Sequence, residues 1–83
     1  MNPKYVVVCT KVGTKEIRIL PHWRSHDSIL DEGHIVPVSA GFFSYFVKSD
    51  LTVGVSCHGR SVSLNLPSRK EDDFLLRQYL GLL

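Results

Sequence analysis

Three of the four histidines lie near acidic residues in the first half of the chain, and such side chains can bind metal ions such as zinc. The set is His22, His26, Asp31, Glu32 and His34. His22 follows Pro21 and precedes the helix that we expect to begin at Ser25, so His22 and His26 would not share one helix face. We therefore predict no metal site and interpret these histidines as surface or capping residues.

The parts of a hydrolytic triad are also present. A serine could combine with His26 or His58 and with Asp27 or Asp50. A triad is defined by its geometry, however, and the chain has no G-x-S-x-G motif and no glycine-rich phosphate loop between a strand and a helix. We predict no catalytic residues and no cofactor.

A run of aromatic residues gives a clearer signal. In a strand, Phe42 and Phe46 would point to one face, and Phe43 and Tyr45 to the other. One pair belongs to the core. We predict that Phe43 and Tyr45 contact a partner, because the next segment offers mainly small polar side chains to cover them. The alternative is that the short helix or Trp23 covers them.

A second aromatic residue stands apart from the expected core. Phe74 lies opposite the leucines of the C-terminal helix and beside Arg77. An exposed phenylalanine beside an arginine is typical of a contact hot spot, so we add Phe74, Arg77 and Trp23 to the predicted partner surface. The alternative is that the helix is rotated, or that a loop wraps its first turn.

Basic residues concentrate near the N-terminus, although the formal net charge is only +2. Lys11, Lys15, Arg18 and Arg24 could bind phosphates, with Trp23 or Tyr45 stacking on bases. Nucleic-acid binding is therefore an alternative function. The other interpretation of these charges is an ordinary solvated surface.

The cysteines and the hydropathy favour a cytosolic location. Cys9 and Cys57 each fall in an apolar strand pattern, which predicts free thiols; a disulfide between strands is the alternative. The apolar run at residues 5–9 is far shorter than the ~20 residues of a membrane span. We expect no membrane association.

The elements that must position these side chains follow from hydrophobic periodicity. The 83 residues predict one domain, 1–83, of the α+β class, with an antiparallel, meander-like sheet of about five strands. A short helix is expected near 25–32 and a C-terminal helix near 68–81, packed on one face of the sheet. Ser68 and Glu71 form a capping-box pattern, and Gly81 a stop signal. A bulge is expected at Ala40 and Gly41.

The strongest local pattern is an alternation of apolar and polar residues over 51–58, which resumes over 62–66 after His58 and Gly59. It predicts a hairpin of these two segments. The apolar side of the C-terminal helix would pack on the resulting sheet. Its members are Leu75, Leu76, Tyr79, Leu80 and Leu83.

Three segments resemble small phage- and prophage-encoded proteins of unknown function. They are residues 37–42 (PVSAGF), 59–64 (GRSVSL) and 68–72 (SRKED), which are similar to that family's V-S-A-G-F strand, S-x-S-L segment and S-R-P-E-D helix start. Lys70 stands where the family has proline, and Asn65 where glycine is usual. The resemblance covers about the C-terminal two-thirds. It implies a phage or prophage origin and a location in the cytoplasm of a bacterial host cell, but no catalytic residues.

Together, these observations favour a non-enzymatic accessory protein that binds another protein of host or phage origin. Such binding could inhibit or modulate a host complex involved in defence or regulation. A homodimer through the same surface is compatible with this prediction. A nucleic-acid-binding protein is the alternative, and a small enzyme the third.

Overall fold

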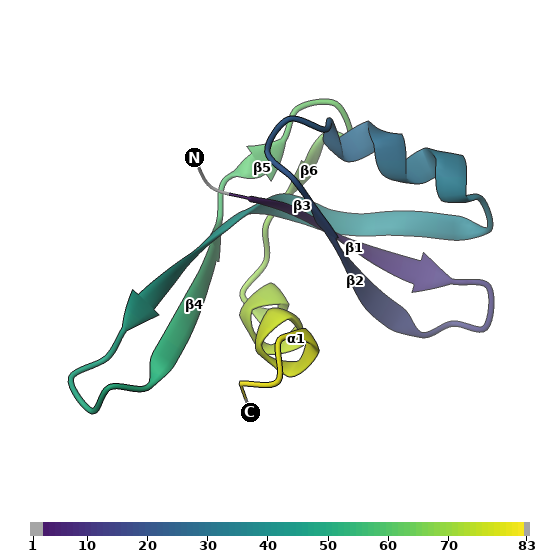
Figure 1. Ribbon diagram of the computed structural model, residues 1–83. Coiled ribbons are helices and arrows are strands. Elements are labelled where there is room, and N and C mark those ends of the chain that lie inside the picture. Colours follow the sequence, from purple (N-terminus) through teal and green to yellow (C-terminus); the bar gives the residue numbers. More distant parts are fainter. Residues whose placement is uncertain (1–2, 83) are drawn as a thin grey trace.

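One antiparallel sheet lies between a C-terminal helix on one face and a short helix with a small arm on the other (Figure 1). The computed structural model describes residues 3–82. Its elements, in chain order, are β1 (Lys4–Thr10), β2 (Lys15–Leu20), the 3-10 helix η1 (His26–Glu32), β3 (Ile35–Val47), β4 (Val53–His58), β5 (Arg60–Ser61), β6 (Leu66–Pro67) and α1 (Glu71–Tyr79). The predicted α+β class with an antiparallel sheet is confirmed.

The first strand lies inside the sheet, whose order is β2-β1-β3-β4. Tyr5 and Val7 belong to the core cluster on the α1 side, whereas Val6 and Val8 belong to the cluster on the η1 side. This explains the uninterrupted apolar run of β1, because a strand covered on both faces has no polar side. The sheet is thus covered on both faces, whereas the sequence pattern predicts cover on one face only.

The long strand β3 changes partner along its length. Residues 35–42 pair with β1, and residues 42–47 pair with β4 on the opposite edge. The β3–β4 hairpin therefore continues past the end of β1 and projects from the body of the molecule, at the lower left of Figure 1. This offset leaves the end of the hairpin without a neighbouring strand on the β1 side.

A bulge in β3 lies at Val38 rather than at Ala40 and Gly41. Val7 pairs with Ser39 and Val8 with Pro37, so Val38 has no partner in β1. Proline has no N–H to donate, and a bulge is one of the few places where a sheet tolerates it. Gly41 serves close packing instead, because a Cβ there would lie 2.5 Å from the carbonyl oxygen of His58.

The segment after β4 does not continue the sheet, so the hairpin predicted for 51–58 and 62–66 is wrong. β4 pairs with β3, and β5 pairs with β6 to form a separate β5–β6 arm. Leu64 and Leu66 of this arm pack against the core cluster on the η1 side. The alternation identified an apolar face on each segment, but it carried no information about the strand partner.

One of the two predicted helix starts differs from the structure. The Ser68 hydroxyl donates to the carbonyl of Gly59 at 2.9 Å, so no Ser68–Glu71 capping box forms, and α1 begins at Glu71. The 3-10 helix η1 begins as predicted, with Ser25 as its N-cap residue, although the Ser25 hydroxyl donates to the carboxylate of Asp27 rather than accepting a backbone N–H. Serine side chains at these turns had closer partners than the helix ends.

The helix end at Gly81 is confirmed. Gly81 has φ of 73°, its N–H donates to the carbonyl of Gln78, and the N–H of Leu82 donates to that of Arg77. This is the Schellman arrangement. On the predicted apolar side, Leu76 is fully buried, but Tyr79 is 59% exposed because it lies at the rim of the sheet. Leu83 lies outside the described residues.

A buried carboxyl group fastens α1 to the sheet. Asp72 is fully buried and accepts hydrogen bonds from the Tyr5 hydroxyl, from the Ser39 hydroxyl at 2.8 Å and from the backbone N–H of Arg69 at 2.9 Å. Arg69 Nη2 lies 3.5 Å away. We call this set the Asp72 latch. It joins the C-terminal helix to the two central strands of the sheet.

Candidate functional site

The end of the β3–β4 hairpin exposes five large apolar side chains, which we call the hairpin patch. They are Tyr45 (57% exposed), Phe46 (46%), Val47 (68%), Leu51 (83%) and Val53 (42%). None of the five belongs to either core cluster of the described residues. Several large apolar side chains exposed to water at one end of a hairpin often mark a binding surface.

Gly54 helps to shape this patch. A Cβ at Gly54 would lie 2.3 Å from the ring of Phe46, so the glycine leaves room for that ring to lie across the neighbouring strand. The ring of Tyr45 meets the ring of Phe43 edge-on, with 5.7 Å between centroids. The two aromatic side chains of the patch are thus held in place by the hairpin itself.

The backbone edge beside the patch is also open. The N–H of Phe43 donates to the carbonyl of Pro3 at 3.1 Å, so the backbone of Phe43 faces the β1 side. The backbones of Tyr45 and Val47 face the same side, because strand residues alternate in direction. The pairing with β1 ends at residue 42, and no other described strand lies along this edge. Such an edge can add another strand.

Only part of the predicted partner surface is exposed. Phe43 is 2% exposed and belongs to the core cluster that includes Leu76, so its predicted surface role is wrong. Phe43 and Tyr45 do share one face, as expected. The core on the α1 side ends between these two residues, and the side chain of Tyr45 is therefore exposed.

The remaining predicted contacts lie in two places. Phe74 is 51% exposed on α1, one turn before the half-buried Arg77. Arg77 reaches the hairpin, where it lines a pocket of about 230 Å³ together with Phe46 and Lys48. Trp23 is 74% exposed, but it belongs to the loop between β2 and η1, and Figure 1 shows this loop on the face of the sheet opposite α1.

The four predicted phosphate-binding residues do not form one patch. Lys11 lies in the turn after β1 and Lys15 opens β2, whereas Arg24 follows the far end of that strand, roughly 17 Å away at the rise of a β-strand. Arg18 is occupied by Glu16 and Glu32, at 2.9 and 2.7 Å. Its guanidinium group holds the pKa of Glu32 below its usual value.

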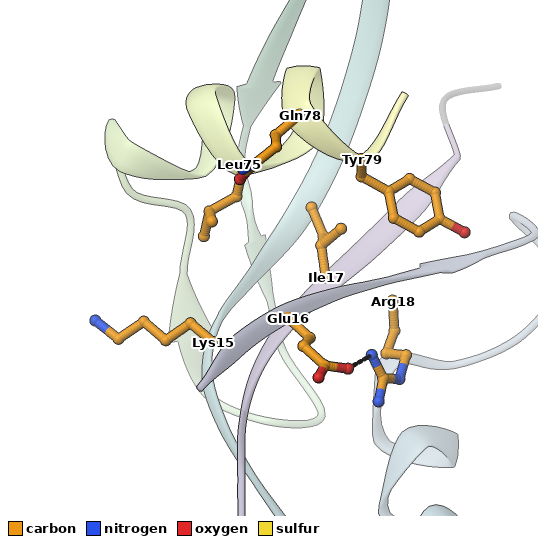
Figure 2. Close-up of a pocket in the computed structure, with 7 residues that line it drawn as sticks. All are labelled: Lys15, Glu16, Ile17, Arg18, Leu75, Gln78 and Tyr79. Atoms are coloured by element: carbon orange, nitrogen blue, oxygen red, sulfur yellow. Dashed lines mark hydrogen bonds and ion pairs between the residues drawn. The ribbon is translucent and has the colours of Figure 1, made fainter. Parts of the chain in front are cut away.

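A groove of about 240 Å³ runs between the edge strand β2 and α1. Figure 2 shows Ile17 pointing toward α1, while Glu16 and Arg18 pair on the opposite side of the strand. Tyr79 closes one end, with its hydroxyl group directed outward. The residues that line the groove include the basic Lys15 and Arg18 as well as the acidic Glu16, so the lining selects no particular sign of ligand charge.

The most perturbed titratable groups belong to the helix attachment rather than to an open cleft. Burial raises the pKa of the Cys57 thiol to about 12, and the neighbouring Asp73 adds to this effect. Burial and the hydrogen bond to Asp72 also raise the pKa of Tyr5. Asp73 Oδ1 accepts the N–H of Cys57 at 2.8 Å. These groups are held in their neutral forms, which suits a structural role.

We expect the Cys57 thiol to resist alkylation in the native protein. Only the thiolate reacts, and the folded pKa of about 12 exceeds the ordinary value of 9.0. In a Cys9→Ser variant at pH 9, iodoacetamide should therefore modify Cys57 at least tenfold more slowly than it modifies the same chain in denaturant. The Cys57→Ser variant reports Cys9 as the comparison. Equal rates for native and denatured chain would contradict the assignment.

The same pKa shifts set the sign of the pH dependence. A group whose pKa is raised by folding stabilises the native state below its unfolded pKa, and this contribution is lost as the pH rises toward the folded value. Cys57 and Tyr5 both act in this direction. The free energy of unfolding should therefore decline above about pH 9.

Other kinds of site find no support within residues 3–82. The histidines, cysteines and carboxylates of this part of the chain form no group of three or more that could hold a metal ion. No helix of the same residues has the length and apolar character needed to span a bilayer. Comparison of the chain with protein-family models, curated proteins and solved structures found no match.

Proposed function

We propose that this protein acts by binding another protein, and that the hairpin patch is the contact surface. The observation that carries the proposal is the projecting end of β3 and β4, where five large apolar side chains lie beside a free strand edge. Aromatic residues supply a large share of binding energy at protein interfaces. The partner segment is an extended strand that pairs with the edge at Tyr45 and Val47 and packs on their side chains.

The proposed biological setting is that of a phage or prophage accessory protein in the bacterial cytoplasm. It rests on the resemblance of residues 37–42, 59–64 and 68–72 to small phage-encoded proteins. In this setting the partner belongs to a host complex whose activity is changed by binding. The protein itself carries out no chemical step.

Site-specific crosslinking tests the proposed surface. A benzophenone amino acid at Leu51 should crosslink to a partner in host lysate, whereas the same group at Val12 should not. The two residues are matched, because each is 83% exposed and each lies in a turn between paired strands. Equal crosslinking from Val12 would reject the hairpin patch, and crosslinking only to a second copy of the chain would replace the proposal by a homodimer.

The purified partner then allows a quantitative test. Tyr45→Ala should weaken its binding by about 2 kcal/mol or more, as expected for an aromatic residue at the centre of an interface. Tyr79→Ala is the matched control, since Tyr79 has a similar exposure of 59% but lies on the rim of α1. Calorimetry would measure both variants, and equal effects would contradict the proposal.

A further inference from the structure

A pocket of about 330 Å³ opens on the η1 side of the sheet, away from the hairpin patch. Its lining comes from four separate parts of the chain: Lys4, Ser25, His26, Phe42, Arg60, Val62 and Ser63. This volume lies at the lower end of the range of about 300–1,000 Å³ that small-molecule sites occupy. The first strand, the start of η1 and the β5–β6 arm together form its walls.

The two cations of this pocket are held by neutral partners. Lys4 Nζ donates to the carbonyl of Arg24 at 2.7 Å, and Arg60 Nη2 donates to the side-chain oxygen of Asn65. Neither takes part in an ion pair within residues 3–82, and no carboxylate lines the pocket. An ammonium group has three donors and a guanidinium group five, so both keep free donors and an uncompensated positive charge.

The floor of the pocket is aromatic and firmly placed. Phe42 pairs directly with Lys4 across the strands. Its ring meets that of His26 edge-on at 5.4 Å and stacks with that of His58 at 6.4 Å. The His26 ring is itself fixed, because its Nε2 lies 2.8 Å from the carbonyl of Gly41 and must donate to that oxygen. A flat apolar group could lie on Phe42, with Val62 at its side.

We propose that this pocket binds a small organic phosphate that carries a planar ring. The phosphate would accept hydrogen bonds from Lys4 and Arg60, and the ring would pack on Phe42. Two cations suit a dianionic group, and their hydrogen bonds to Arg24 and Asn65 lower the entropy lost on binding. Of the residues that line the pocket, Ser25 is hydrogen-bonded to a carboxylate, because its hydroxyl donates to Asp27.

Titration calorimetry with three probes tests this assignment. Adenosine 5′-monophosphate has both a ring and a phosphate, adenosine has the ring alone, and ribose 5-phosphate has the phosphate alone. The monophosphate should bind, and each of the other two should bind at least tenfold more weakly. Its affinity should fall with added salt, as expected for partly exposed charges. No measurable binding of the monophosphate at millimolar concentration would overturn the proposal.

Two kinds of variant test whether the monophosphate binds in this pocket. The double variant Lys4→Met and Arg60→Met should weaken binding of the monophosphate at least tenfold. The control is the double variant Lys11→Met and Lys70→Met, which makes the same change in net charge elsewhere. This control should leave the affinity for the monophosphate unaltered. Val62→Asp supplies a second test that does not depend on the cations, because Val62 is 88% exposed and its replacement leaves the core intact. A carboxylate there should repel the phosphate. Binding unchanged by Val62→Asp and by the double variant would overturn the proposal.

Discussion

Phe43→Ala should destabilise the protein by about 3–5 kcal/mol, the usual cost of removing a buried phenylalanine side chain. Phe43 is 2% exposed and shares its core cluster with Tyr5 and Leu76, so its loss leaves a cavity between the sheet and α1. Chemical denaturation monitored by circular dichroism would measure the change. A loss below about 1 kcal/mol would show that the ring does not fill the core.

Tyr45→Ala is the matched control for this substitution. Tyr45 lies two residues further along the same strand face but is 57% exposed, and its main described contact is the edge of the Phe43 ring. We expect a loss of about 1 kcal/mol, the typical worth of an aromatic pair. The two variants therefore separate stability from binding. Only Tyr45→Ala is suitable for testing the proposed interface, because Phe43→Ala would impair binding merely by unfolding the chain.

Asp72→Ala should be about as damaging as Phe43→Ala. It removes the shared acceptor of the Tyr5 hydroxyl, the Ser39 hydroxyl and the Arg69 N–H. Each buried donor left without a partner costs about 1–3 kcal/mol, so we expect a total loss of roughly 3–5 kcal/mol. Asp72→Asn retains an acceptor oxygen and should lose less. Asp31→Ala, which changes an exposed carboxylate on η1, should alter stability by at most about 0.5 kcal/mol.

A double-mutant cycle isolates the bond between the helix and the first strand. Tyr5→Phe alone should destabilise the protein, since it removes a donor from the buried Asp72. In the Asp72→Ala background the same change should be nearly neutral, because the hydroxyl has already lost its acceptor. Equal effects of Tyr5→Phe in both backgrounds would show that the two residues are not coupled.

The sequence predicted the elements of the fold better than their partners. The sequence located the strand that carries residues 42–46 and the end of the C-terminal helix at Gly81, because both patterns depend on neighbouring residues. It could not show that β4 pairs with β3 rather than with residues 62–66, since an apolar face fits any adjacent strand. That choice depends on backbone conformation, such as the φ of 76° at Gly59.

For the candidate sites too, the sequence predicted local features but not which distant residues come together. Periodicity placed Phe43 and Tyr45 on one face, but the limit of the core between them depends on where β1 and α1 end. A clearer signal was available in Tyr45-Phe46-Val47, because three consecutive apolar residues at the end of a strand cannot all face one core. A carboxylate in the first turn of a helix is ordinarily exposed to solvent, whereas Asp72 is fully buried, and no local pattern indicates this. No local pattern could bring Lys4 and Arg60 together.

The Asp72 latch can form only after the C-terminal helix has been synthesised. Tyr5 and Asp72 are 67 residues apart, and the strand that carries Tyr5 lies in the middle of the sheet. During synthesis, the apolar run of β1 therefore emerges from the ribosome long before the helix that covers one of its faces. Residues 5–9 cannot pack against that helix until residue 76 has been synthesised. In the newly made chain this run is the segment most in need of protection from aggregation.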